Sequence, residues 1–580
     1  MAEPRAASPP LGDGLRTNLQ RSASLEGAGQ AMSLDQPLLR HSLTAPGRLN
    51  IWLEQAAHLH ELPKMTDGEL ERRLGVSELT LLGIGACIGA GIFVLTGVEA
   101  RIAGPSVGLA FLLAAVCSMF NGMCFSELAS RLPVSGSTYL YTYCMFGELT
   151  ALVVVVNQLV DYHIGAAAIS RSIVAYVAGA LDVMGLPMHD CLVGCKPFAS
   201  MPWLDISLGA PAILGVVTIV VAGGAKTNAT VTGVMTVLKV AIVIFVIVLG
   251  MDMVDTDRWV PVFPHGLSAT LQAAATLNYA FIGYDVIANA AEECVNPQRH
   301  IPAAIIGALS CCGALYLAMC MVLCGMQEAV TIDVSAPVSS AFVQHGMDRV
   351  ASVINVGAFV GMFTGLLAGV YGQSRIYFAL ARDHMVPSLL RGTPKCAVWC
   401  GTVASLLAMF LDLEMLASFL NIGVLVSYSS TAASVLVINS CCRKTEYCLL
   451  AVVSALAASL AVGPYFWPPL AGISAAALAG VIGWACLRRC YHCCPGGAFS
   501  CPGKPLTPLV ALVGNVYLAA ELSWHAWLRL LALGFLVVAT HTLASFFGCL
   551  DAYARKRMVC NTVRSASKAA GTNPGVGGCR

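Results

Sequence analysis

The sequence predicts an all-α polytopic membrane protein with about 14 transmembrane helices. Only 11% of its 580 residues are charged and 57% are hydrophobic, whereas about 25% of a typical soluble domain is charged. The apolar runs are about 20 residues long, which suits helices rather than the roughly 10-residue alternating strands of a barrel. This composition excludes an ordinary soluble enzyme and a disordered scaffold. The net charge of only +1 argues against a nucleic-acid binder.

The N-terminal region differs from the rest of the chain. Residues 1–74 are rich in Ser, Pro, Gly and Arg and contain no sustained apolar run. We expect a cytoplasmic tail there, disordered over residues 1–50, with a short segment before the membrane. No apolar stretch follows the early arginines, so a signal peptide is not expected.

From Leu79 onward, apolar blocks alternate with short polar links. Residues 551–580 are predicted to form a cytoplasmic tail. The predicted spans are 79–100, 104–128, 147–178, 207–224, 228–250, 267–292, 302–325, 350–381, 396–411, 414–440, 447–463, 469–487, 505–522 and 527–549.

The distribution of basic residues supports this count. With the N-terminus inside, most of the Lys and Arg residues in the links fall on the cytoplasmic side, as the positive-inside rule expects. The opposite links carry only Arg101, Lys196, Arg258, Arg349 and Arg529. Both tails are basic and therefore also favour the cytoplasm, which requires an even number of helices. Fourteen is favoured over thirteen.

The first span contains four glycines within nine residues, at 83, 85, 89 and 91. Glycine weakens a helix interior by about 1 kcal/mol relative to alanine. Small residues at these positions can serve close helix packing. Alternatively, the stretch is unwound, and the amides of Gly89–Gly91 bind a carboxylate.

The sixth span has a polar interruption, Asn278–Val286, with Gly283 and Asp285 at membrane depth. A buried Asp normally faces a cavity or a partner. Two interrupted helices in corresponding positions of two halves indicate a transporter site. The five-helix spacing between them fits a five-plus-five inverted repeat, which we infer from that spacing alone.

Several further charges lie inside predicted spans. Lys239 is near the middle of the fifth span, either paired structurally with a carbonyl or an acid, or placed where a coupling ion or proton would bind. Asp161 and Arg171 lie ten residues apart, about 15 Å along a helix, so each needs a partner elsewhere. Glu148 opens the third span, where a helix-dipole role is the simpler interpretation.

The acids at the end of the sixth span and the cysteines have simple interpretations. The simplest interpretation of Glu292 and Glu293 is that they lie at a solvated helix end. Most of the 24 cysteines lie in apolar spans as small buried side chains. Cys191 and Cys195 could form a disulfide or remain free thiols. For the group Cys490, Cys493, Cys494 and Cys501 beside His492, inert or palmitoylated cysteines are favoured over zinc binding. We predict neither a metal nor a cofactor.

Several motifs in order resemble the cationic amino acid transporter family of the amino acid–polyamine–organocation superfamily. They are GIGACIGAGIFVLTG (83–97), FSELASRLPVSGSTYLYTYCMFGEL (125–149), TNATVTGVMTVLKVAIVIFVIVLG (227–250), YAFIGYDVIANAAEECVNPQRHIPAAI (279–305), SRIYFALARDHMVP (374–387) and PLTPLVALVGNVYLAAELSWHAWLRL (505–530). The resemblance covers most of residues 70–550. It implies a LeuT-type transporter core of ten helices in residues 75–445, followed by four additional helices in residues 446–550.

The resemblance also implies roles for individual residues. Gly89, Ala90 and Gly91, with Ile88 beside them, would take the substrate α-carboxylate. The carbonyls of Ala280, Phe281 and Ile282 would take the α-amino group, with the Phe281 ring as a gate. Lys239 looks like the lysine that replaces sodium in proton-coupled relatives. Asp285 aligns with a position facing the substrate side chain. Glu148 aligns with an acid associated with transport, and Asp161 is a further candidate charge.

These observations predict a sodium-independent secondary transporter that works by alternating access. Its expected substrates are amino acids, with cationic ones (arginine, lysine, ornithine) favoured. A neutral amino acid or polyamine permease and a non-transporting sensor are the alternatives; the scattered histidines disfavour a membrane-embedded enzyme. The expected partners are an amino acid and the lipid bilayer, with no nucleic acid and no prediction of oligomeric state. The plasma membrane is favoured, with a vacuolar or lysosomal membrane as the alternative.

Overall fold

The structure is a computed structural model of the 580-residue chain. It describes residues 72–546 with gaps, and every described residue lies in one compact unit spanning Trp52–Arg580. Residues 1–71 of the predicted N-terminal tail, the predicted C-terminal tail, the eleventh and twelfth spans and the cysteines 490, 493 and 494 lie outside the described residues. The gaps fall at 90, 184–187, 196–205, 333–336, 384, 387–389, 391, 412–420, 440–498, 521 and 523.

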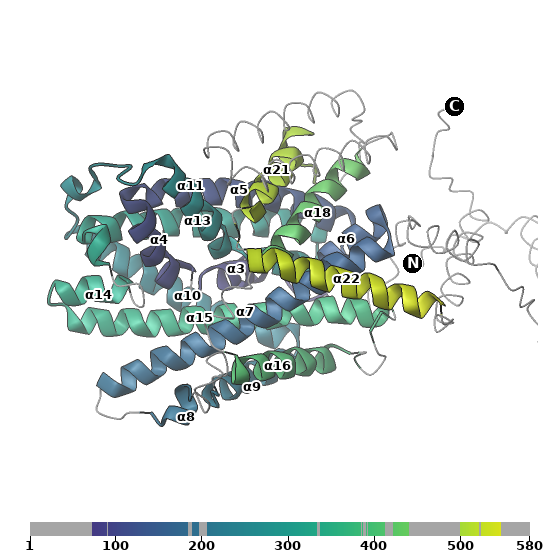
Figure 1. The fold of residues 1–580 in the computed structure, drawn as a ribbon, viewed down its shortest axis with the longest axis horizontal. Coiled ribbons are helices and arrows are strands. Elements are labelled where there is room, and N and C mark those ends of the chain that lie inside the picture. Colours follow the sequence, from purple (N-terminus) through teal and green to yellow (C-terminus); the bar gives the residue numbers. More distant parts are fainter. Residues whose placement is uncertain are drawn as a thin grey trace, which may run out of the picture. The chain divides into compact units, whose positions relative to one another are not determined.

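The described part of the chain is helical and contains only isolated β-bridges (Figure 1). The long apolar blocks of the sequence form its main helices, since a helix satisfies its own backbone hydrogen bonds in lipid. These helices are α3 (Val76–Cys87), α4 (Thr96–Ala103), α5 (Val107–Arg131), α7 (Glu148–Val183), α9 (Gly209–Ala222), α10 (Ala225–Met251), α11 (Gly266–Leu277), α12 (Asp285–Asn289), α13 (Pro297–Met326), α15 (Asp348–Arg382), α16 (Thr393–Phe410), α18 (Ile422–Ile438), α21 (Leu506–Ala520) and α22 (Trp524–Phe546).

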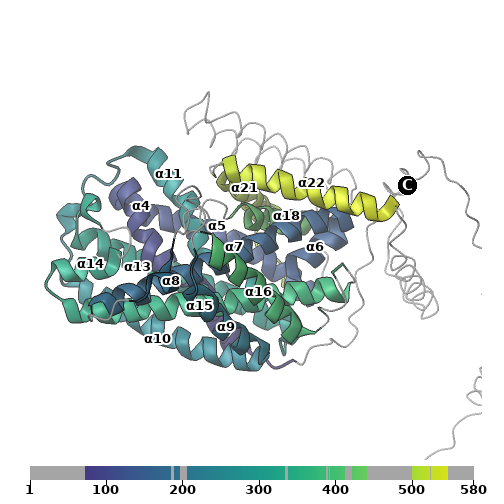
Figure 2. The same cartoon turned by 60° about the horizontal axis from the view of Figure 1, so that its bottom comes forward.

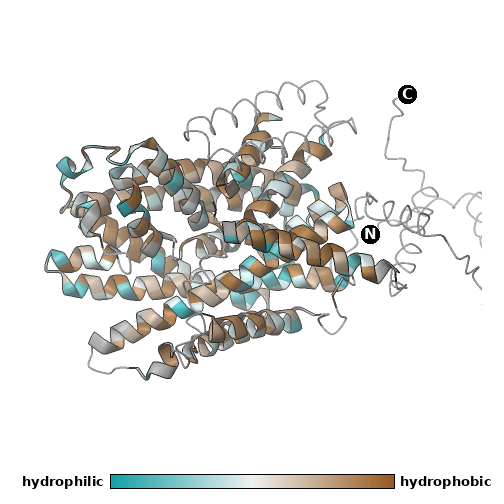
Figure 3. Cartoon of the chain, viewed as in Figure 1, coloured by the Kyte–Doolittle hydropathy of each residue, from teal (hydrophilic) through white to brown (hydrophobic). Residues whose placement is uncertain are grey.

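The all-α polytopic fold is therefore confirmed. Among the described residues, seven helices are long and apolar enough to cross a membrane, and four shorter ones are apolar as well. Figure 3 shows hydrophobic residues along nearly the full length of these helices. Twelve of the predicted spans correspond to described helices. The total of fourteen stays a prediction.

Besides the single turn α8 (Asp190–Val193), two helices that the sequence analysis did not anticipate are too short to be spans. Helix α6 (Ser137–Phe146) lies between Gly136 and Gly147, whose φ values of +102° and +90° favour glycine. It packs against α7 and α18. The other short helix is α14 (Pro337–Gln344), which packs against α15.

The interior is built by close helix contacts. Helix α13 packs against α5 and α3, α10 against α15 and α3, and α16 against α9. The outward residues of α10, such as Val234 and Val248, are apolar and exposed. An apolar exposed surface on a helix with a buried opposite side is what a bilayer requires.

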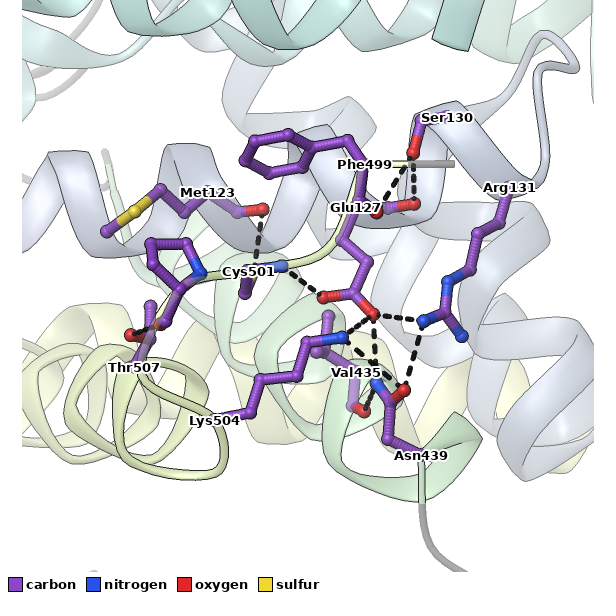
Figure 4. Close-up of polar contacts among 11 residues, drawn as sticks. Met123, Glu127, Ser130, Arg131, Val435, Asn439, Phe499, Cys501, Lys504 and Thr507 are labelled. Carbon is purple, nitrogen blue, oxygen red and sulfur yellow. Dashed lines mark hydrogen bonds and ion pairs between the residues drawn. The ribbon is translucent and has the colours of Figure 1, made fainter. Parts of the chain in front are cut away.

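The segment before α21 is tied to the core by a buried carboxylate, Glu127 on α5 (Figure 4). Glu127 pairs with Lys504 and, at 2.7 Å, with Arg131. It also accepts hydrogen bonds from the side-chain amide of Asn439 at 3.0 Å and from the backbone N–H of Cys501 at 2.9 Å. Helix α21 packs on α18, and α22 packs on α7 and α18 (Figure 2).

Candidate functional site

The first predicted span is broken in the middle. Helix α3 ends at Cys87, and Ile88 takes an extended backbone conformation with ψ of 100°. Ala90 lies outside the described residues, and a five-residue π-helical segment begins at Gly91 and leads into α4. The backbone of Gly89 therefore lies outside both regular helical segments. The break falls within the cluster of glycines, as the sequence predicts.

The predicted sixth span is broken as well. Helix α11 runs into a 3₁₀ turn at Asn278–Phe281, Ile282 is extended, and α12 begins at Asp285. Gly283 has a φ of +135°, which L-residues with a side chain rarely adopt. A Cβ atom at Gly283 would lie 2.7 Å from the Cβ and 2.8 Å from the carbonyl carbon of Ala86.

The two breaks face each other. A Cβ atom at Gly91 would lie 2.5 Å from the Cβ and 2.7 Å from the Cα of Ala280. Both unwound segments line one cavity, to which α7, α15 and the start of α18 also contribute. Its lining includes Gly89, Gly91, Ala280, Ile282, Gly283, Asp161, Tyr162, Gly365, Gly369 and Val424.

Lys239 on α10 is fully buried and bound to the first break. Its Nζ donates to the carbonyl oxygens of Gly85 at 2.8 Å and Ile88 at 2.6 Å, and to Thr364 Oγ1 at 2.7 Å. None of the described carboxylates lies within ion-pair distance of it. Of the alternatives for this lysine, pairing with carbonyls is the one observed. The ammonium group occupies the position of a cation at a helix C-terminus.

The carbonyls at the second break have protein partners. Tyr316 Oη donates to the Ala280 carbonyl at 2.9 Å, and Cys87 Sγ donates to the Phe281 carbonyl at 3.3 Å. Each carbonyl oxygen has a second lone pair available to a ligand. The Phe281 ring is buried, with its centroid 5.0 Å from that of Tyr316.

Asp285 lies behind the cavity wall rather than on it. Its Oδ2 accepts hydrogen bonds from Tyr162 Oη and, at 3.4 Å, from Gln158 Nε2. Tyr162 lines the cavity, whereas Asp285 does not. The side chain is fully buried, and no described Lys, Arg or His forms an ion pair with it.

Asp161 lies on the cavity wall and has a cationic partner. Arg529 Nη1 lies 2.5 Å from its Oδ1, and the backbone N–H of Val424 donates to its Oδ2 at 2.9 Å. The assignment of Arg529 to a link was wrong, because it lies within α22. Arg171 instead donates to the Ala408 carbonyl at 2.6 Å. The two charges of α7 thus have separate partners, as their spacing predicts.

Three other residues singled out by the sequence lie away from the cavity. Glu148 Oε1 is 3.8 Å from His541 Nε2 at the first turn of α7. Glu292 and Glu293 are not solvated, contrary to the prediction, because α15 covers them. Glu292 lies 3.1 Å from Arg382, and Glu293 lies 2.8 Å from Arg375.

Sequence reasoning missed several residues around the cavity. Tyr162 and Gln158 donate hydrogen bonds to Asp285, and Thr364 accepts one from Lys239. Tyr316 donates to the Ala280 carbonyl at the second break, and Arg529 forms an ion pair with Asp161 on the cavity wall. The only signal for Tyr162 was its position next to Asp161. Cys195 is a free thiol, and the described residues contain no cluster of three or more metal-ligating side chains.

Comparison with known proteins gives one consistent family. The model of the amino acid permease family matches residues 74–487. The chain is 36% identical over 516 residues to cationic amino acid transporter 9, chloroplastic, of Arabidopsis thaliana, covering 83% of this chain and 89% of that protein. It is 32% identical over 483 residues to the branched-chain amino acid permease BcaP of Bacillus subtilis, covering 82% and 93%. It is 36% identical over 378 residues to the methylthioribose transporter of the same bacterium, covering 64% and 82%.

Proposed function

Because this chain belongs to the amino acid permease family, we propose that it is a sodium-independent secondary transporter of cationic amino acids. The observation that carries the proposal is the pair of broken helices that face each other across one cavity. Unwound backbone inside a membrane protein is tolerated where it lines a cavity. It offers amides and carbonyls to a ligand with both acidic and basic groups.

The backbone at the two breaks matches the two ends of an amino acid. Gly89 precedes and Gly91 begins a helical segment, and the amides of Gly89–Gly91 would bind the α-carboxylate, favoured by the helix dipole. The carbonyls of Ala280, Phe281 and Ile282 would accept the α-ammonium group. The contact between Gly91 and Ala280 keeps the two groups within the length of one substrate backbone.

The cationic preference rests on Asp285. A buried carboxylate held by hydroxyl and amide donors, with no cation among the described residues, favours a positive charge nearby. Reorientation of Tyr162 would open the way from the cavity to this carboxylate. The name of the Arabidopsis relative supports the same substrate class, whereas the BcaP name supports neutral substrates.

Lys239 would serve as a fixed cation. Its ammonium holds the carbonyls of Gly85 and Ile88, where a bound metal cation would otherwise be needed. Transport would then need no sodium, and the membrane potential would drive cationic substrates inward.

Further parts of the proposal concern topology and location. The ten-helix core would span residues 75–445, with a five-plus-five inverted repeat, and four helices would follow. Both termini would be cytoplasmic. The plasma membrane is the favoured location, and a vacuolar or lysosomal membrane is the alternative.

The direct test is uptake by the purified full-length chain in proteoliposomes. Labelled arginine, lysine, leucine and putrescine would be compared in sodium-free buffer, with protein-free vesicles as the control. We expect arginine and lysine to accumulate above the control. Uptake of leucine without arginine or lysine would make it a neutral amino acid permease, uptake of putrescine alone a polyamine permease, and no uptake at all would favour a sensor.

A further inference from the structure

Arg529 links the last described helix to the cavity. It lies on α22, beyond the proposed core, and its guanidinium group contacts Asp161 at 2.5 Å. The side chains of Arg529 and Asp161 are only 10% and 2% exposed. Asp161 itself lines the cavity between the two broken helices. A residue beyond the proposed core therefore contacts a charged residue of the cavity wall.

The position of α22 along α7 is fixed at both ends. Arg529 meets Asp161, and twelve residues later His541 approaches Glu148, thirteen residues before Asp161 on α7. Between these points a Cβ atom at Gly534 would lie 3.8 Å from Val153. The helices thus run antiparallel in close register. The exposed face of α22 carries Leu531, Phe535 and Leu543, so Arg529 is turned inward while apolar residues face outward.

Asp161 is also held from the side of α18. Val424 donates its backbone N–H to Oδ2, and a Cβ atom at Gly423 would lie only 2.9 Å from the same oxygen. The carboxylate therefore has little room to turn away from the cavity. Without Arg529 it would present an uncompensated negative charge to the substrate, because none of the other described cations pairs with it.

We propose that Arg529 sets charge selectivity through Asp161. By neutralising the acid on the cavity wall, Arg529 leaves Asp285, which forms no ion pair with the described cations, as an uncompensated carboxylate beside the cavity. The cavity then favours substrates with one side-chain cation and an α-carboxylate over diamines, which would need a second acid. This inference rests on the proposed function and adds the source of its preference between amino acids and diamines.

The test measures the relative potency of two competitors against labelled lysine uptake in proteoliposomes of the full chain. Unlabelled putrescine represents diamines and unlabelled leucine represents neutral amino acids. A ratio of half-inhibitory concentrations does not depend on how much folded protein each preparation contains. It therefore distinguishes a change in charge selectivity from a loss of folded protein caused by weaker packing between α22 and α7.

The expected changes have opposite signs in two single variants. In Arg529→Gln the uncompensated charge of Asp161 should make putrescine at least about tenfold more potent relative to leucine. In Asp161→Asn, which removes the acid beside Arg529, putrescine should become less potent relative to leucine. Arg529→Lys and the double variant Asp161→Asn/Arg529→Gln should keep the wild-type ratio, because the wall stays neutral in both.

The outcomes distinguish this inference from the proposed function. Lysine uptake by the wild type with the same ratio in the variants would overturn the inference alone. So would shifts of the same sign in Arg529→Gln and Asp161→Asn. Wild-type vesicles that take up none of the amino acids would overturn the proposed function and this inference with it. If Arg529→Gln is not recovered as folded protein, the shift in Asp161→Asn decides the question.

Discussion

Lys239 shows how one side chain can stabilise a broken helix. The last carbonyls of α3 have no helical partners beyond the break, and an unpaired buried carbonyl is costly in a membrane. Lys239 donates to two of these carbonyls, at Gly85 and Ile88, and Thr364 takes its third N–H. The break is therefore held open by protein groups before any substrate binds.

Gly89 gives the sharpest test of the carboxylate site. A Cβ atom there would meet only the Gly361 carbonyl, at 3.8 Å, which is an ordinary contact. Gly89→Ala should therefore leave the fold intact while its methyl group crowds the approach to the amides. We expect the KM for arginine to rise at least about tenfold, because the substrate carboxylate would lose roughly one charge-assisted hydrogen bond. The measurement is initial-rate uptake.

The matched control is Gly369→Ala, which adds a methyl group to the same cavity with nothing within 4 Å. It should change the KM much less. Equal effects of the two variants would count against carboxylate binding at Gly89. Gly91 is less informative, since a Cβ atom there would clash with Ala280 and disturb the contact between the breaks.

Asp285 gives a test of side-chain selectivity. Asp285→Asn removes the negative charge and keeps the shape, so Tyr162 and Gln158 can still hydrogen-bond there. Uptake of arginine should fall far more than uptake of leucine, because removing one partner of a desolvated charge pair costs about 2–5 kcal/mol. Parallel losses for both substrates would assign Asp285 to folding instead.

At the scale of single residues, the sequence predicts positions better than partners. The depth of Lys239, Asp161 and Asp285 follows from where they lie in apolar spans. Their partners come from helices distant in the sequence, which neither periodicity nor spacing can identify. Arg529 was misplaced because it lies near the start of an apolar block. Glu293 was wrongly predicted to be solvated, because its partner Arg375 lies on another helix.

At the scale of elements, the long apolar helices were predictable and the short ones were not. Spans of about 20 apolar residues have a single stable arrangement in lipid. Helix α6 has only 10 residues and begins and ends at glycines, so tertiary packing on α7 and α18 decides its structure. The two breaks were predictable because Gly and polar residues inside an apolar span are costly without a role.

The attachment of the segment before α21 depends on the Glu127 carboxylate. Lys504→Met should lower the stability of the detergent-purified protein by an amount on the order of 2–4 kcal/mol, because it weakens a buried charge cluster. Lys504 is only 5% exposed, whereas Arg131, on the same carboxylate, is 20% exposed.

The matched control is therefore Arg131→Met, which should cost about 1 kcal/mol or less. Chemical or thermal unfolding of the purified variants provides the comparison. If the two variants are equally stable, the buried position of Lys504 has no special importance for attaching this segment.

At the scale of the whole described unit, several of the buried charges lie at or beside one cavity. Asp161 contacts Arg529 on the cavity wall, Lys239 holds one break, and Asp285 lies behind Tyr162. Elsewhere, apolar residues cover the outward faces of α10 and α22. Charge at depth is expensive, so the placement of these three charges beside the two breaks favours a transport role for them.

The response to driving forces separates two roles for Lys239. A fixed ammonium predicts uptake that follows the membrane potential. A lysine that binds and releases a proton in each cycle predicts uptake that rises when the external side is acidified and is lost in Lys239→Ala. The binding of Lys239 to three acceptors, in α3, at its C-cap Ile88 and in α15, favours the fixed role.

The measurement that tests the central claim most directly is arginine uptake into proteoliposomes without sodium, with potential and pH gradient imposed separately. A potential of 100 mV, negative inside, is worth about 2.3 kcal/mol for one imported charge. We predict uptake that rises strongly with this potential and changes little with the pH gradient alone. Strict dependence on sodium would contradict the assignment of Lys239 as the resident cation and, with it, the proposed mechanism.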